Sequence, residues 1–303
     1  MDSVIAVDLG GTNVRVARVL RDGTIVSFQQ TGVSGITEGT EIAATIADLI
    51  ETVMVDSSPL AIGVSTAGPV DIRTGSVVHS PNMQAESISL VSPLLDRFQI
   101  PVHMLTDCKA GALGEHVFGC REDNLVYITV STGIGGGVLQ NGRILMGADG
   151  NAGEIGHLIV DTSYNLQCGC GGVGHWEAFC SGSGIPRFFE LWCKTRKIDI
   201  TPMTVAEILN RADAGDEPYV SFARELSRLN TCGLQAVICA YNPSVIVLDG
   251  PIALQHPSLF AGDVGIYLSK PKILFSKLQG RAPLLGAAAY AFQFSTLSPS
   301  AGL

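Results

Sequence analysis

Two cysteines and two histidines, all side chains that bind metal ions, lie close together along this chain: His157, Cys168, Cys170 and His175. Thiolate and imidazole in a set of four suit tetrahedral Zn²⁺. The Cys-x-Cys spacing is tighter than the Cys-x₂-Cys of zinc fingers, so the generic finger pattern does not apply. The alternative is two buried thiols and two surface histidines, which this clustering disfavours. We therefore expect a closed, structural zinc site that orders the segment from Glu154 to Glu177.

Two glycine-rich turns are the second chemical feature. The first is Asp8-Leu9-Gly10-Gly11-Thr12-Asn13, and the second is Ser131-Thr132-Gly133-Ile134-Gly135-Gly136-Gly137. Glycine lets the backbone close on a phosphate, Thr12 and Asn13 add donors, and Asp8 could hold Mg²⁺ through water. One such turn alone would be an ordinary hairpin turn, but two, one in each half, indicate phosphates held between two domains. Neither is a P-loop or a Rossmann turn, because the Gly-Lys-Ser/Thr ending and the Gly-x-Gly-x-x-Gly helix start are missing.

Asp107 follows Thr106 at the expected junction of a strand and a helix. It could be a helix N-cap, a role worth about 1 kcal/mol. It could also be a general base, because ligands of α/β proteins bind at strand ends. The residue alone favours the cap, and its position at a strand end raises the odds of the base.

The composition is that of a folded, acidic chain. Hydrophobic residues make up 46% of the 303 residues and charged residues 16%, which disfavours disorder. The net charge is −9 and no Lys/Arg-rich run is present, which argues against a nucleic-acid partner. The sequence contains no apolar stretch near the roughly 20 residues of a membrane span, and it opens on a strand rather than a signal peptide. We therefore expect a cytoplasmic protein whose eight cysteines are reduced.

Hydrophobic periodicity indicates which elements position these residues. We expect strands at 4–7, from 14 onward, near 24–30 and at 60–65, with a helix at 41–54. A helix at 90–98, a strand at 102–106 and a helix at 108–117 follow. Strands at 124–131 and 136–139 flank the second turn, 203–240 is mostly helical, 244–248 is a strand and 283–294 is the closing helix. Because both halves open with strand, glycine turn and strand, we expect an N-terminal α/β domain over 1–118 plus 288–303 and a C-terminal α/β domain over 119–287.

In combination, these motifs resemble the ROK family (repressors, open reading frames and kinases) within the sugar kinase/actin superfamily. The resemblance covers nearly the whole chain in the right order. Glu154-Ile155-Gly156-His157 and Cys168-Gly169-Cys170-Gly171 are its most specific parts, and Pro81-Asn82 is similar to the family's sugar loop. It implies an α/β, two-domain actin-like (ribonuclease H-like) ATPase fold with an active-site cleft between the domains.

The resemblance also implies a role for each matching residue. Asp107 would remove the proton from the attacking sugar hydroxyl, usually O6. The sugar would be held by Asn82, Asp107, Glu154, His157 and Glu177. The nucleotide phosphates, with Mg²⁺, would be bound by Asp8, Gly10, Gly11, Thr12, Asn13, Ser131, Thr132, Gly133, Gly135 and Gly250. Zinc would be bound by His157, Cys168, Cys170 and His175, so that His157 serves both metal and sugar.

Three positions depart from the family's pattern. His175 stands where the family has its third zinc cysteine, and imidazole is an acceptable ligand. Thr106 replaces the Asn before the catalytic Asp, which removes an amide that contacts the sugar. Leu248-Asp249-Gly250 replaces a strand end of Gly-Gly, where a carboxylate could disturb the nucleotide or hydrogen-bond its ribose.

The expected function is that of a hexose kinase that uses Mg-ATP, with glucokinase as first choice and a structural zinc. N-acetylmannosamine or N-acetylglucosamine kinase and fructokinase have closely similar motifs and stay open, and Thr106 and Asp249 keep a non-catalytic sugar sensor open. A repressor is disfavoured because Asp8 lies too near the start for a preceding DNA-binding domain, and a metal hydrolase because the zinc set has no open position. The expected partners are a sugar and ATP, without nucleic acid or membrane, and the resemblance leaves a homodimer open.

Overall fold

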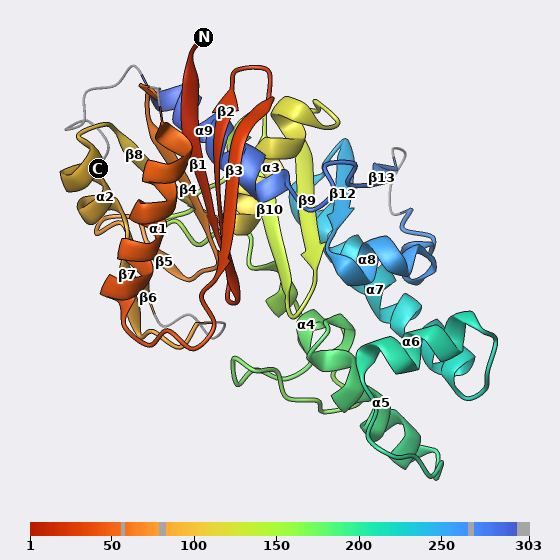
Figure 1. Ribbon diagram of the computed structural model, residues 1–303. Helices are drawn as coiled ribbons and strands as arrows, with labels where there is room; N and C mark the ends of the chain where they lie inside the picture. The colour runs from red at the N-terminus through yellow and green to blue at the C-terminus, as the bar shows by residue number, and fades with distance from the viewer. Residues whose placement is uncertain (56–57, 79–82, 266–269, 296–303) are drawn as a thin grey trace. The chain divides into compact units, whose positions relative to one another are not determined.

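The computed structural model describes residues 1–55, 58–78, 83–265 and 270–295, and the chain divides into two compact α/β units (Figure 1). The first unit comprises 1–123, 139–152 and the described part of 277–303, and the second comprises 124–138 and 153–276. The domain limits expected from the sequence, at 118 and 288, stay a prediction.

The first unit is built on a five-stranded sheet in the order β3-β2-β1-β4-β8. Its strands are β1 (Ser3–Leu9), β2 (Asn13–Leu20), β3 (Ile25–Gly32), β4 (Ile62–Thr66) and β8 (Val102–Thr106). The first three form an antiparallel meander, and β4 and β8 run parallel to β1. Leu9, Thr66 and Thr106 are register partners at the carboxyl ends, so the residues after these strands meet at one edge.

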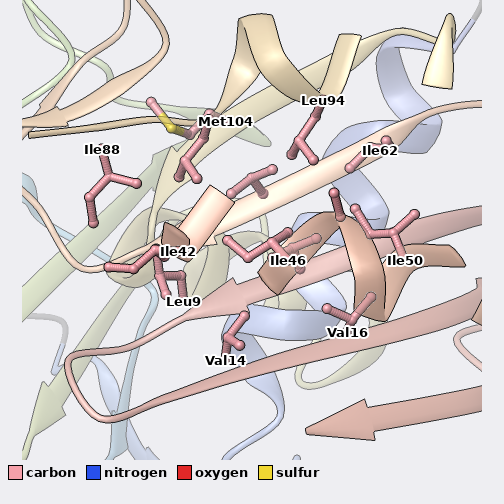
Figure 2. Close-up of a cluster of buried hydrophobic side chains, with 14 of the residues drawn as sticks. Leu9, Val14, Val16, Ile42, Ile46, Ile50, Ile62, Ile88, Leu94 and Met104 are labelled. Carbon is pink, nitrogen blue, oxygen red and sulfur yellow. The ribbon is translucent and has the colours of Figure 1, made fainter. Parts of the chain in front are cut away.

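The two faces of this sheet are covered by different helices. Ile5, Val7 and Leu9 of β1 pack with α1 (Gly39–Met54) and α2 (Val91–Phe98), whereas Val4 and Ala6 pack with α9 (Ala282–Phe294). Figure 2 shows the first of these cores, in which side chains of α1 lie over β1 and β2. Because successive side chains of a strand point to opposite faces, the continuous apolar run of β1 fits a strand buried on both sides.

Helices α3 (Asp107–Phe118) and α9 approach each other closely because glycines lie at their contacts. A Cβ on Gly286 would lie 1.6 Å from the Ala110 carbonyl oxygen, and one on Gly114 would lie 2.3 Å from that of Ala282. Gly63 of β4 is equally restricted, since its Cβ would lie 1.9 Å from the Ala287 carbonyl oxygen. The last helix is therefore fitted against both α3 and the sheet of the first unit.

A small antiparallel sheet that the sequence did not predict also belongs to the first unit. It consists of β5 (Val70–Asp71), β6 (Ser76–Val78) and β7 (Ser87–Ser89). The predicted sugar-loop residue Asn82 lies outside the described residues.

The second sheet has the order β11-β10-β9-β12-β13. Its strands are β9 (Leu125–Val130), β10 (Ile134–Gln140), β11 (Arg143–Ile144), β12 (Val245–Asp249) and β13 (Lys272–Phe275). The second unit contains β9, β12, β13 and β10 as far as Val138, whereas β11 belongs to the first unit. The second unit also contains 3₁₀ turns η1 (Ile155–His157) and η2 (Pro257–Phe260), and helices α4 (Trp176–Cys180), α5 (Gly184–Thr195), α6 (Val205–Asp213), α7 (Tyr219–Tyr241) and α8 (Pro251–Gln255).

The interior of the second unit is aromatic where α4, α5 and α7 meet. Phe179, Phe188 and Phe222 are fully buried, with ring centroids 4.9 Å and 5.2 Å apart in succession. Trp176 is also fully buried and donates from Nε1 to Asn230 Oδ1 at 2.8 Å, which anchors α4 on α7.

All eight cysteines lie in the described part of the chain, and no disulfide bond joins any of them. Among the described residues, every helix is too short or too polar to cross a bilayer.

Candidate active site

The four predicted metal ligands lie together in the second unit. His157 ends η1, Cys168 and Cys170 lie in the loop that follows, and His175 directly precedes α4. Their ligand atoms all lie within 4.8 Å of one another. His157 Nδ1 is 3.8 Å from Cys168 Sγ, and Cys170 Sγ is 3.2 Å from His175 Nδ1. Tetrahedral zinc holds such atoms roughly 3.3–3.8 Å apart, so the donor set fits this metal after a slight contraction.

Backbone hydrogen bonds shape the loop that carries the cysteines. The Cys168 amide donates to the Gly172 carbonyl at 2.7 Å, and the Gly171 amide donates to the Cys168 carbonyl at 3.0 Å. Gly171 has φ +91°, a conformation that favours glycine. His175 pairs with Ile159 as an isolated bridge. This geometry turns Cys168 and Cys170 towards the two histidines.

The Cys168 thiol is buried beside the Glu177 carboxylate and the Cys170 thiol. Burial raises the pKa of Cys168 to about 11, and the Cys170 thiol and Glu177 carboxylate act in the same direction. A metal binds the thiolate, so zinc entering this cluster would displace a proton from Cys168.

Glu177 joins the Cys/His cluster to the second glycine turn. Its Oε2 accepts a hydrogen bond from the Ile134 amide at 2.9 Å, and its Oε1 lies 3.7 Å from Cys168 Sγ. A Cβ on Gly133 would lie 2.5 Å from Glu177 Oε2. Glycine at 133 is therefore needed for this contact, whatever else the turn binds.

The second glycine turn is also held from the residues between α4 and α5. The Gly182 amide donates to the Ser131 carbonyl at 2.7 Å. The Ser183 amide and hydroxyl both donate to the Thr132 carbonyl, at 3.1 Å and 2.9 Å. Gly136 abuts Ile155, while Thr132 is exposed. Thr132 is thus exposed on a supported backbone, whereas Ile134 is buried.

In the first unit, Asp8 lies at the end of β1 and is buried. Its Oδ2 forms a salt bridge with Arg15 of β2, and its Oδ1 accepts the Ser65 hydroxyl at 2.9 Å. The adjoining glycine turn closes through a hydrogen bond of 2.9 Å from the Gly10 amide to the Asn13 carbonyl. Asn13 Nδ2 donates to Thr12 Oγ1 at 3.0 Å, and both side chains are exposed.

Gly10 differs from Gly133 in having room around it. Among the described residues, a Cβ at Gly10 would meet only the Asn13 carbonyl oxygen, at an ordinary 3.5 Å. The local fold therefore does not by itself require glycine at this position. Close approach of a ligand to the backbone would require it.

Asp107 is the first residue of α3, and the N-cap position is Thr106. Asp107 Oδ1 accepts the Cys108 amide at 2.7 Å. This hydrogen bond orients the Asp107 carboxylate at the start of the helix. Asp107 is not the N-cap residue, which was one of the two roles that the sequence left open. Thr106 is buried, and the buried Lys109 donates to its hydroxyl at 3.4 Å. Lys109 was not predicted as a site residue.

The departure at Asp249 has a structural role within the second unit. Asp249 is buried, its Oδ2 accepts the Tyr127 hydroxyl at 2.8 Å, and its Oδ1 accepts the Gly250 amide at 2.7 Å. Gly250 has φ +88°, and a Cβ there would lie 2.5 Å from the Val130 carbonyl oxygen. Internal partners therefore hold this carboxylate.

The predicted residues fall into two groups. Asp8 to Asn13 and Asp107 lie in the first unit, whereas Ser131 to Gly135, Glu154, Gly250 and the metal ligands lie in the second. Glu154 is exposed at the start of η1. The partners that sequence reasoning missed are Arg15, Ser65, Ser183 and Tyr127. Of these four, Arg15 carried a signal, because it and Arg18 are charged residues in a mostly apolar strand.

Sugar kinases and repressors are among the known proteins that this chain resembles. A family model described as ROK family matches residues 4–293. The glucokinase of Pyrobaculum calidifontis is 36% identical over 258 residues, which is 84% of this chain and 81% of that protein. The xylose repressor of Bacillus subtilis is 30% identical, over 65% of this chain and 50% of that protein.

Two solved structures extend the similarity to the fold. The ROK hexokinase of Thermus thermophilus superposes with a TM-score of 0.84 at 30% identity, over 96% of this chain and 98% of that one. The ROK glucokinase of Streptomyces griseus, solved with glucose and AMPPNP, superposes with a TM-score of 0.74 at 26% identity, over 96% of this chain and 99% of that one.

The fold is thus the two-domain actin-like α/β fold of sugar kinases. The chain belongs to the ROK family.

Proposed function

We propose that the protein is an ATP-dependent sugar kinase that phosphorylates the 6-hydroxyl of a hexose, with glucose as the first choice. The contact between Glu177 and Ile134 carries the proposal, because it joins a predicted sugar ligand to a predicted phosphate-binding turn at 2.9 Å. The glucokinase relative and the hexokinase structure support the same class of reaction.

In this mechanism Asp107 accepts the proton of the attacking hydroxyl. Phosphoryl transfer depends mainly on positioning and charge stabilisation, and a placed base adds about 10²–10⁴ in rate. Because one carboxylate oxygen of Asp107 accepts the Cys108 amide, the side chain is oriented before substrate arrives.

The two glycine turns offer their amides to the nucleotide phosphates. Asp8 is the residue suited to hold Mg²⁺ through water, since Arg15 and Ser65 already orient its carboxylate. Magnesium would neutralise charge on the transferring phosphoryl group. We assign Ser131, Thr132, Gly133 and Gly135 to the same phosphates and Gly250 to the nucleotide.

Zinc has a structural part in this proposal. His157 Nδ1 faces Cys168, so Nε2 is the nitrogen available to a sugar hydroxyl. A metal on Nδ1 would fix the ring and its tautomer, which would orient Nε2. Glu154 and Glu177 flank the loop and would complete the sugar contacts, together with Asn82.

A panel of sugars with Mg-ATP tests the function directly. Purified protein is assayed for ADP formation with glucose, mannose, fructose, N-acetylmannosamine and N-acetylglucosamine. We expect the highest kcat/KM with glucose. A higher kcat/KM with another sugar of the panel would change the assigned substrate, and the protein would still be a sugar kinase. Absence of turnover with every sugar and nucleotide would refute the kinase proposal.

A non-catalytic sugar sensor is the second candidate, and the similarity to a xylose repressor favours it. Thr106, which replaces an amide-bearing residue, supports the same view. Sugar binding by calorimetry without ADP formation would identify a sensor. We expect the protein to lie in the cytoplasm whether it is a kinase or a sensor, because no disulfide joins its cysteines and thiols stay reduced there.

A further inference from the structure

Helix α4 and its flanking residues connect the Cys/His cluster to the second glycine turn. His175 immediately precedes the helix, Glu177 is its second residue, and Gly182 and Ser183 follow its end. All of these residues lie in the second unit. The fully buried Trp176 packs the helix against α7. Its ring lies so close to Gly233 of α7 that a Cβ there would be 2.3 Å away.

At the start of α4, one carboxylate contacts both features. Glu177 Oε2 accepts the Ile134 amide at 2.9 Å while Oε1 lies 3.7 Å from Cys168 Sγ. A larger residue at 133 would displace the Glu177 carboxylate, because its Cβ would lie 2.5 Å from Oε2. Movement of the cysteine loop would therefore change the support of the turn.

Beyond the end of α4, the backbone contacts the turn again. Gly182 donates to the Ser131 carbonyl and Ser183 to the Thr132 carbonyl. A Cβ on Gly182 would lie 2.8 Å from the Ser131 carbonyl oxygen, so the two segments are in tight contact. Hydrogen bonds therefore fix the turn at Ser131–Thr132 and at Ile134, on either side of Gly133.

We propose that Glu177 is a positioning residue for the second glycine turn, and that the Cys/His cluster preorganises this turn for nucleotide phosphate through Glu177 and α4. Glycine-rich backbone is costly to order, so hydrogen bonds that fix it in advance favour binding. The inference rests on the proposed function and adds to it, since the cluster would then support nucleotide binding as well as sugar binding.

Calorimetric titration with Mg-ADP in the absence of sugar tests the role of Glu177. We expect Glu177→Ala to weaken Mg-ADP binding by about tenfold, because the Ile134 amide loses a charged acceptor. Glu177→Gln keeps an acceptor and should stay within about threefold of wild type. Glu190→Ala is the matched control, since it removes an exposed carboxylate of α5 in the same unit and should leave sugar-free Mg-ADP binding unchanged.

The metal cluster is tested by the same titration. Cys170→Ser, which changes an exposed side chain, and chelator-treated wild type should both bind Mg-ADP more weakly, with the loss of zinc followed by elemental analysis. Glu177→Asp keeps the charge but draws the carboxylate back from the Ile134 amide by one methylene, and should weaken Mg-ADP binding as Glu177→Ala does. This variant replaces Glu177→Ala if circular dichroism shows that Glu177→Ala is unfolded.

Two results would overturn the inference while leaving the kinase intact. Unchanged Mg-ADP affinity of Glu177→Ala, with sugar binding lost, would make Glu177 a sugar ligand only. Tighter Mg-ADP binding would mean that its carboxylate merely repels phosphate. If wild type binds sugar but no nucleotide, the proposed function and this inference both fail.

Discussion

Arg15 and Asp8 are register partners on β2 and β1, and Arg15 Nε lies 2.9 Å from Asp8 Oδ2. Arg15 Nη1 also donates to the Gly280 carbonyl at 2.8 Å. One guanidinium thus orients a buried carboxylate and fastens the turn before α9. The residue that we assign to Mg²⁺ is held in place before any ligand is bound.

Arg15→Met should destabilise the protein by about 2 kcal/mol, because the Asp8 carboxylate is only 8% exposed and would lose its cation. Chemical denaturation followed by circular dichroism measures this cost. Arg73→Met is the control, since the Arg73 side chain is 88% exposed in its pair with Asp71 and should change stability by less than about 0.5 kcal/mol. Equal effects of both changes would mean that the Asp8 pair is no more than a surface contact.

Asp107→Asn should lower kcat by about 10²–10⁴ while the fold and sugar binding are retained. Asparagine is nearly isosteric and can still accept the Cys108 amide, so a purely structural Asp107 predicts little change. ADP release gives kcat, and calorimetry gives sugar affinity. Near-normal turnover on the best sugar would remove Asp107 from the mechanism.

Cys168→Ser should lower the zinc content below one ion per chain, reduce Tm by about 5–10 °C and weaken sugar binding. The physical reason is that the metal would contribute to folding of the loop that presents His157 and Glu177. Elemental analysis and thermal unfolding are the measurements. Cys239→Ser changes an exposed thiol outside the cluster and should keep the zinc content and Tm of wild type. Wild-type protein that cannot be loaded with zinc would contradict the assignment.

Gly10→Ala should weaken nucleotide binding about tenfold and leave sugar binding unchanged, because a methyl group fits the fold at Gly10 but would obstruct a phosphate. Gly133→Ala should weaken both ligands, because its Cβ displaces Glu177. Separate titrations with Mg-ADP and glucose distinguish the two variants. Loss of sugar binding in Gly10→Ala would show that the first turn is structural.

The sequence predicted those elements whose periodicity is strong and local. The strand at 102–106 and the helix at 283–294 match β8 and α9 within a residue. The short strands β5 to β7 and the edge strand β13 were missed, because two to four residues are too few for a period to appear. Helix α5 was also missed, where Pro186 follows a glycine-rich start.

Within the candidate site, spacing alone predicted the Cys/His cluster, since its ligands are near neighbours along the chain. The link from Glu177 to Ile134 joins residues 43 positions apart, and only the folded chain reveals it. Asp249 accepts a hydrogen bond from Tyr127, which is 122 positions away and gave no sequence signal, while its expected effect on the nucleotide stays a prediction. Long-range hydrogen bonds of this kind depend on tertiary packing.

The fit of α9 against β1, β4 and α3 has a consequence for synthesis of the protein. The helix α9, which covers one face of β1, is translated more than two hundred residues after that strand. At typical elongation rates this interval is on the order of tens of seconds. Until α9 is made, Val4, Ala6 and the face of α3 that carries Gly114 lack the helix that packs against them. Nascent chains stalled before Ala282 should therefore be captured by chaperones far more readily than chains stalled after Phe294 has emerged.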